Sequence, residues 1–284
     1  MSIRNNQQRV GGSRPDSDAA ATSTQAANPL QFVTPTEFVE LPSQGKGYPP
    51  EHPLHNQEVI EIRFMTAKDE DILTSQALLK KGLALERMME NVIIDKKVKP
   101  SSLLVGDRNA ILIATRASGY GNHYETSVAC PACGERSTLM FNLEDKSFNH
   151  GGVPEDMEVE ATDNGTFVVA MPLSKLKVEV RMLNGKDEQW LLQTAKSKKK
   201  HKLQDSALTN QYRRMIVSVN GQTDRKALDY VIENLPAIDS RHLRLAYKSL
   251  SPDVKVFKDF SCPACNHEQA LEVPFNTDFF WPDR

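Results

Sequence analysis

The chain has 284 residues, with 35 basic and 37 acidic side chains and a formal net charge of −2. This near-neutral charge argues against a protein built mainly to coat nucleic acid, which usually carries a strong basic excess. No apolar run approaches the roughly 18 residues that cross a bilayer, and the N-terminus lacks the apolar core of a secretory signal peptide. We therefore expect one large folded domain or two modest ones, acting without a membrane.

The N-terminal segment, residues 1–34, is rich in small and polar residues. Such a segment cannot offset its ordering entropy by burial, which predicts a flexible arm. The loop Leu41–Pro50 follows, dense in glycine and proline. It lacks the Gly-Lys-Ser/Thr ending of a phosphate-binding loop, so we do not expect a nucleotide there.

The elements of the first half follow from periodicity. Alternating apolar residues at 60, 62 and 64 predict a half-buried strand, and an apolar stripe predicts helix over 69–94, which Gly82 divides. A further apolar helix is expected to begin at Asp107 and to end at Gly119.

The second half begins after an acidic, glycine-containing stretch around 151–166. Alternation over 176–182 predicts a strand, and helical patterns follow over 187–195, 205–216, 224–234 and from 240 to 250. Ser251 and Pro252 end the last of these helices.

Two parts of the sequence repeat in the same order. The segment 60–70 resembles 178–188 and shares the triplet Lys-Asp-Glu, and the tetrad Cys-Pro-Ala-Cys occurs at 130–133 and again at 262–265. This order predicts an internal duplication, with units over 35–150 and 151–284 and about 14 extra residues in the second. The acidic residues of the triplets suit a first helical turn, so we do not interpret them as catalytic.

Each Cys-x-x-Cys pair can present two thiolates from one tight turn, which fits two corners of a tetrahedral metal. Gly134 and Asn266 follow the two tetrads, and both residue types tolerate a left-handed backbone. Alternating residues flank each pair, so each is expected at the tip of a hairpin. Two facing hairpins would close a structural zinc site, one ion per chain, with four ligands: Cys130, Cys133, Cys262 and Cys265.

Other states of the cysteines remain open from the residues alone. These are a redox Cys-x-x-Cys, an iron–sulfur site or unligated thiols; a redox pair would normally lie at a helix start in a thioredoxin-like unit. His123, His150 and His267 could replace a cysteine ligand, although a surface position suits each of them better.

Two further segments are candidates for partner contacts. The basic run 196–202 could contact nucleic acid, an anionic lipid or an acidic partner, but it lacks the interleaved aromatic residues that stack on bases. The C-terminal segment 275–284 carries three adjacent aromatic residues, which could fold back onto the core or anchor a partner. No catalytic motif is present to indicate an enzyme.

Several motifs of the first half resemble the baseplate protein family of T-even-type contractile-tailed bacteriophages. They are Leu41–Pro49, Glu61–Leu73, Leu78–Gly82, Gly106–Ala110, Ser118–Gly121 and Cys130–Gly134. The resemblance covers residues 38–150 well and the remainder less distinctly. It implies a late structural or assembly protein of the tail baseplate, associated with the hub, that binds other tail proteins and is assembled in the bacterial cytoplasm into the virion.

The sequence therefore predicts an α+β protein in which a duplicated unit of strand, helices and Cys-Pro-Ala-Cys hairpin is joined in a zinc-ribbon-like site. We expect a non-enzymatic baseplate component, possible oligomers within the assembly, and no membrane contact. Its expected partner-contact segments are the N-terminal arm, the loop Leu41–Pro50 and the aromatic C-terminus. The alternative function is that of a zinc-ribbon nucleic-acid-binding protein using the basic run.

Overall fold

A computed structural model describes residues 34–201, 206–274 and 277–280. Residues 1–33 of the expected arm, Lys202 and Trp281 lie outside these residues. The helices are α1 (Ala67–Thr74), α2 (Gln76–Lys81), α3 (Ala84–Val92), α4 (Val105–Tyr120), α5 (Gly185–Lys200), α6 (Ala207–Met215), α7 (Arg225–Asn234) and α8 (Ala237–Leu250), with short 3-10 turns η1 (Pro100–Ser102) and η2 (Thr277–Phe280). None of the helices described is long and apolar enough to cross a membrane.

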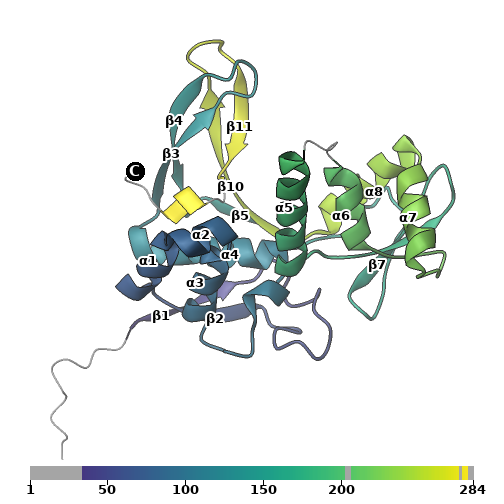
Figure 1. Ribbon diagram of the computed structural model, residues 1–284, viewed down its shortest axis with the longest axis horizontal. Helices are drawn as coiled ribbons and strands as arrows, with labels where there is room; N and C mark the ends of the chain where they lie inside the picture. Colours follow the sequence, from purple (N-terminus) through teal and green to yellow (C-terminus); the bar gives the residue numbers. More distant parts are fainter. Residues whose placement is uncertain (1–33, 202–205, 275–276, 281–284) are drawn as a thin grey trace, which may run out of the picture. The chain divides into compact units, whose positions relative to one another are not determined.

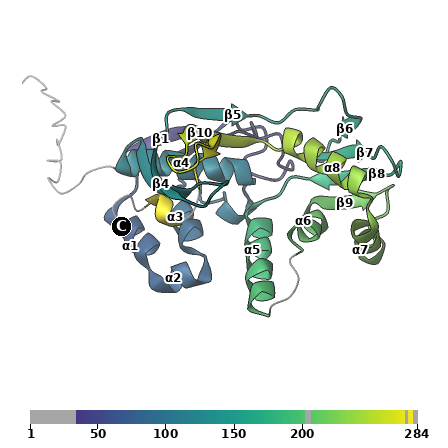
Figure 2. The same ribbon diagram turned by 90° about the horizontal axis from the view of Figure 1, so that it is seen from above.

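Four small sheets accompany the helices, so the fold is mixed α+β as expected (Figure 1). Their strands are β1 (Thr36–Glu40), β2 (Val59–Arg63), β3 (His123–Ala129), β4 (Arg136–Asn142), β5 (Lys146–Asn149), β6 (Val159–Ala161), β7 (Thr166–Ala170), β8 (Lys177–Arg181), β9 (Ile216–Val219), β10 (Asp253–Ser261) and β11 (Glu268–Glu272). The sheets are β1-β2, β3-β4, β11-β10-β5 and β6-β7-β8-β9, all antiparallel. Figure 2 shows α6, α7 and α8 beside the sheet of β6–β9.

The expected strand over 60–64 is β2, and it leads directly into helix α1. Arg63, the last residue of β2, donates two hydrogen bonds to the carboxylate of Asp69, at 2.7 and 3.0 Å. The same carboxylate accepts the backbone N–H of Thr66, the residue that precedes the helix. One buried aspartate therefore fixes the turn and satisfies a donor at the helix start.

The joint between β8 and α5 has the same construction. Arg181 donates to Asp187 at 2.7 and 2.8 Å, and Asp187 accepts the backbone N–H of Asn184 at 3.1 Å. Asn184 in turn accepts the N–H of Asp187, which completes a reciprocal cap. The repeated carboxylates thus have a structural role at both helix starts.

Glycine positions set two helix ends, one as expected and one not. Gly82 adopts φ +70 and ends α2, as its position inside the helical pattern predicts. The expected end of the next helix at Gly119 is wrong: α4 continues to Tyr120, and Gly121 follows it with φ +86. Gly119 instead lies against the side chain of Met65, close enough that an added Cβ would be in van der Waals contact with it.

The main core lies around α4, whose Ile111 and Ile113 are fully buried. Phe279 and Phe280 of the C-terminal turn η2 are also buried, and Arg116 donates a hydrogen bond to the carbonyl of Phe279. The expectation that these aromatic residues are an exposed anchor is therefore wrong for Phe279 and Phe280. They pack edge to face with each other, and Phe279 packs against Tyr124. The rings are buried because removing their apolar surface from water is favourable.

The loop Leu41–Pro50 is also mostly packed against the body, which limits its use as a partner contact. Asp107 of α4 accepts the N–H and hydroxyl of Ser43 and the hydroxyl of Tyr48, at 3.0, 2.7 and 2.7 Å. Burial raises the pKa of Asp107 against the lowering effect of these hydrogen bonds. Lys46, Pro49 and Pro50 remain exposed.

One strand pairing crosses the expected boundary between the two units. β5 ends at Asn149, in the first expected unit, and pairs with the first part of β10 in the second. The second part of β10 pairs with β11, so β10 runs from the body into a projecting hairpin. The two halves therefore share one sheet.

Candidate metal centre

Each Cys-Pro-Ala-Cys tetrad forms the turn of a β-hairpin, as the flanking alternation predicts. The first joins β3 to β4 and the second joins β10 to β11. Gly134 and Asn266 follow the second cysteine of each tetrad with φ +79 and +56, the left-handed conformation that their residue types predicted.

The two turns have the same backbone hydrogen bonds. Gly134 donates to the carbonyl of Cys130 at 2.8 Å, and Asn266 donates to that of Cys262 at 2.9 Å. The N–H groups of Cys130 and Cys262 close the hairpins by donating to residues 135 and 267. Equal turns with equal side chains present their sulfurs in the same way.

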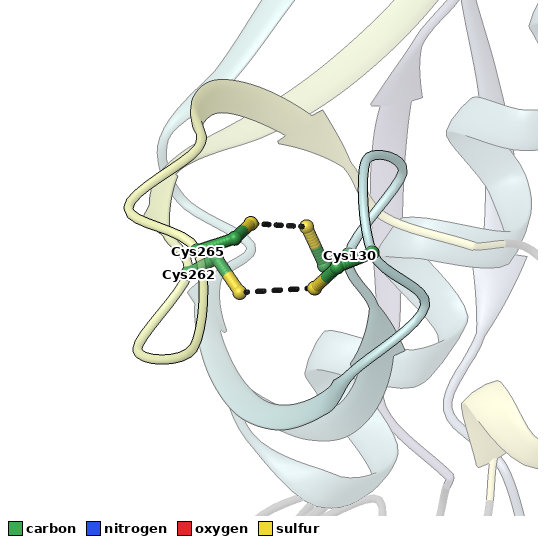
Figure 3. A group of neighbouring side chains, drawn as sticks. Cys130, Cys262 and Cys265 are labelled. Carbon is green, nitrogen blue, oxygen red and sulfur yellow. Dashed lines mark hydrogen bonds between the residues drawn. The ribbon is translucent and has the colours of Figure 1, made fainter.

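All four sulfurs meet where the hairpins lie side by side. Cys130 Sγ lies 3.7 Å from Cys265 Sγ, and Cys133 Sγ lies 3.6 Å from Cys262 Sγ. The four atoms lie within 4.8 Å of one another. Figure 3 shows Cys130 facing Cys262 and Cys265 from the opposite hairpin. Tetrahedral ligands with Zn–S bonds of about 2.3 Å are separated by about 3.8 Å, so the sulfurs are already near the spacing that zinc requires.

A small apolar cluster supports the cysteines, separate from the main core. Cys130, Cys262 and Phe260 are buried, with the partly buried residues Val128, Leu139 and Leu271 packed around them. Cys133 and Cys265 are exposed. So few apolar residues give little independent stability, which is the situation in which proteins use a metal or a covalent link.

The backbone around the site favours thiolate at one position. Burial opposes ionisation of Cys130, but the N–H groups of Cys133 and Ala132 donate to its sulfur and help to lower its pKa to about 6. At Cys265 the N–H of His267 lowers the pKa, but the neighbouring thiols raise it to about 12. A divalent cation at the centre would remove this conflict by stabilising all four thiolates.

The structure brings together all four sequence-predicted ligands and none of the alternative histidines. In the part of the chain that the structure describes, no other group of His, Cys, Asp and Glu is arranged to hold a metal. His267 is paired with Gln269, and His150 contacts the carbonyl of Pro42. No disulfide joins the four cysteines.

One histidine–serine contact in the body resembles a catalytic pair, but its hydrogen bond runs in the wrong direction for catalysis. His52 Nε2 lies 2.9 Å from the hydroxyl of Ser102. However, His52 Nδ1 accepts the N–H of Leu54, so Nε2 carries the proton and donates to Ser102. In this arrangement the imidazole does not act as a base toward the hydroxyl, whose own hydrogen bond goes to the carbonyl of Lys99.

Residues 196–200 of the basic run form the end of α5. Lys198, Lys199 and Lys200 lie in its last turn, where positive charge interacts favourably with the negative end of the helix dipole. Lys196, Lys199 and Lys200 are exposed, and Lys198 bonds to Ser206. These five residues are therefore part of a helix rather than an element of the cysteine site.

One family of known proteins matches the chain over the whole described range. The family model described as T4 bacteriophage base plate protein matches residues 34–281. The chain belongs to this family. Comparison with curated proteins and with solved structures finds no match.

Membership extends the resemblance seen in the sequence, because the match includes both cysteine hairpins and the whole described body. The family identifies the chain as a component of a phage baseplate. The ion pairs of Asp69 and Asp187 were missed by the sequence reasoning, although Arg63 and Arg181 stand at equal positions in the repeated segments. That repeated arginine was the available signal.

Proposed function

We propose that the chain is a non-enzymatic structural or assembly component of the hub region of the tail baseplate, where it binds other tail proteins. The match of the family over almost all of the described residues carries this proposal. Its role would be to present surfaces to neighbouring proteins from a body whose strand-to-helix connections are held by Arg–Asp ion pairs. Such a protein belongs to the virion tail and is assembled in the host cytoplasm.

One structural zinc ion per chain completes the proposal. Its ligands are the sulfurs of Cys130, Cys133, Cys262 and Cys265, whose spacing supports a tetrahedral site. Four thiolates leave no open position for a substrate or a catalytic water. The ion would hold the two hairpins together and stabilise the fold.

We also propose that the body is an internal duplication, with units over 35–150 and 151–284. The pairing of β1 with β2 places Thr36 opposite Arg63, and that of β7 with β8 places Thr166 opposite Arg181. In each half an Arg–Asp pair then joins the second strand to a helix.

The segment that pairs with the second strand of each half, after the helices, is also equivalent in the two halves. Ile93 bridges to Ile62 after α3, and Ile216 pairs with Val180 after α6. Asp239 at the start of α8 accepts two N–H groups from the loop after β7, and Asp107 at the start of α4 accepts the N–H and the hydroxyl of Ser43 from the loop after β1. Equivalent contacts at equivalent positions support descent of both halves from one unit.

The zinc-ribbon nucleic-acid alternative receives no specific support. The lysines lie on α5 rather than on the hairpins, and the net charge is −2. A salt-sensitive affinity for DNA or RNA, lost when Lys199 and Lys200 are replaced by Gln, would favour this alternative.

Quantitative mass spectrometry of particles and assembly intermediates tests the baseplate role. We expect the chain in purified particles at a fixed ratio to other baseplate proteins. Presence in intermediates but not in particles would contradict a virion role and leave an assembly factor. Absence from both would contradict the proposal.

Metal analysis of the purified chain tests the zinc site. We expect one zinc per chain, with the metal lost from Cys265→Ser, whose exposed position keeps the folding cost low. His267→Ala, next to the site but outside the ligand set, is the matched control and should retain zinc. Full zinc in Cys265→Ser, or another metal in the wild type, would contradict the proposed site.

A further inference from the structure

The outer edge of β1 is open among the described residues. β1 pairs with β2 on one side, and no described strand pairs with the other. Phe64 donates its N–H to the carbonyl of Pro35, and Leu41 donates its N–H to the carbonyl of Glu58. These two bonds determine which residues of β1 direct their backbone groups toward β2. By the alternation of an antiparallel ladder, the backbone groups of Thr36, Phe38 and Glu40 point away from β2.

The corresponding edge in the second half is covered. β7 occupies the position of β1, and β6 pairs along its outer edge, with Glu160 opposite Val168. Ala170 donates to the carbonyl of Glu158 across the same edge. By the strand register, Val168 corresponds to Phe38. In the second half, the edge in this position therefore carries a short antiparallel strand.

The residue before β1 prevents the chain from covering its own edge in the same way. The turn from β6 to β7 ends at Gly165, which adopts φ +71. Pro35 stands at the corresponding position, and the proline ring fixes φ near −65°. The tight hairpin of the second half therefore cannot form before β1.

The exposed face beside this edge is apolar and acidic. Phe38 is 70% exposed, and Val59 and Ile94 are also exposed. Ile94 donates to the carbonyl of Glu61, so these side chains flank the same two-stranded sheet. Glu40 is exposed on the same face as Phe38, whereas Glu37 lies on the other face of β1, where one of its oxygens is buried without a hydrogen-bond partner.

Charge decides which strand fits. β1 reads Thr-Glu-Phe-Val-Glu and contains no basic residue, so pairing with a second copy would bring four glutamates together. A strand with alternating basic and apolar residues would place an apolar side chain beside Phe38 on one face and a basic side chain near Glu37 on the other.

We propose that the outer edge of β1 binds an extended segment of another tail protein, in which basic and apolar residues alternate, by adding it as a strand. Main-chain hydrogen bonds would supply affinity, and Phe38 and Glu37 would supply selectivity. This proposal deepens the binding role proposed above and rests on it only for the source of the segment. Its test uses the isolated chain, so its failure leaves the baseplate role untouched.

The probe is a fluorescein-labelled synthetic peptide of alternating lysine and valine, long enough to span β1, added to the purified full chain. We expect anisotropy to show binding, and hydrogen exchange to show new protection of the Phe38 amide. A peptide with the same backbone but glutamate for lysine should bind at least about tenfold more weakly. Methylation of the alternate peptide nitrogens that would enter the ladder should weaken binding by a similar factor.

Two variants of Phe38 separate the backbone from the side chain. Phe38→Pro removes the outward N–H at an edge position that tolerates proline, and should abolish binding. Phe38→Thr keeps the N–H and should weaken binding partially. Val168→Thr, at the covered position of the second half, is the matched control and should bind like the wild type.

Three results would overturn the proposal. Equal binding of the N-methylated peptide would show charge attraction without strand addition. Unchanged binding by a folded Phe38→Pro variant would place the peptide elsewhere. A dimer in sedimentation velocity that Phe38→Pro dissociates would make a second copy the occupant.

Discussion

Arg63 and Asp69 form a bidentate ion pair between the end of β2 and the first turn of α1, with the aspartate side chain fully buried. Arg181 and Asp187 form the same pair between β8 and α5. Each pair fixes the direction in which a helix leaves a strand. The arginine side chains are 21% and 32% exposed, so the charges are only partly removed from water.

Asp69→Ala should lower the free energy of unfolding by about 2 kcal/mol, because it leaves the Arg63 guanidinium and the N–H of Thr66 without their acceptor. Urea denaturation measures this change. Asp71→Asn, two residues along the same helix and exposed, is the control and should stay within about 0.5 kcal/mol of the wild type. Equal stability of the two variants would show that the ion pair is dispensable.

The fold should lose stability as the pH falls below about 4. Burial alone would raise the pKa values of Asp69 and Asp187, but hydrogen bonds from Arg63 and Arg181 hold them below the ordinary value of 3.8. Because these folded-state pKa values are depressed, the ion pairs stabilise the fold fully above the unfolded value and are lost as pH falls through the folded one. The raised pKa of buried Asp107 acts with the opposite sign.

Unfolding free energies measured between about pH 6 and pH 2 test this dependence. Asp187→Asn should flatten the acid limb, whereas Asp71→Asn should leave it unchanged. An acid limb that is equally steep in Asp187→Asn would assign the effect to other carboxyl groups.

Tyr48→Phe should lower the free energy of unfolding by about 2 kcal/mol. The Tyr48 hydroxyl donates to Asp107 and accepts the N–H of Leu104, so the variant leaves the Leu104 N–H without its acceptor and buried Asp107 with one donor fewer. Tyr230→Phe is the control, since Tyr230 is 70% exposed. Thermal or urea unfolding compares the two, and equal effects would contradict a specific role for the Tyr48 hydroxyl.

Removal of the metal should loosen the paired hairpins first. With a chelator, we expect Tm to fall by roughly 5 °C or more and proteolysis to begin in β3–β4 or β10–β11. Readdition of zinc should restore both. A Tm unchanged in protein shown to be metal-free would contradict a stabilising ion.

Gly106→Ala should lower the free energy of unfolding by about 3 kcal/mol, since a Cβ there would lie 2.1 Å from the carbonyl oxygen of Pro252. This close approach packs the start of α4 against the chain that enters β10. Gly152→Ala is the control, because a Cβ at that position meets nothing within 4 Å. Calorimetry of both variants distinguishes a packing clash from a general effect of glycine replacement.

Local features were predictable where one short segment contains its own cause. Gly82 ends α2 and Asp224 caps α7 because a left-handed glycine and a capping carboxylate act on adjacent backbone groups. Strands β6 and β7 were not predicted, since the acidic stretch that contains β6 and leads into β7 lacks a clear period. The end of α4 moved from Gly119 to Gly121 because only the second glycine adopts the left-handed conformation.

The sequence by itself determined the two cysteine turns, since each tetrad and its following Gly or Asn specify a hairpin from adjacent residues. The repeated order of motifs also predicted that the pairs would face each other. Only the tertiary structure decided which sulfurs meet, because Cys130 and Cys265 are 135 positions apart and their 3.7 Å separation depends on how the two hairpins pack. It also decided that Phe279 and Phe280 are buried while Phe38 is exposed, because burial depends on which elements cover a side chain and not on its hydrophobicity alone.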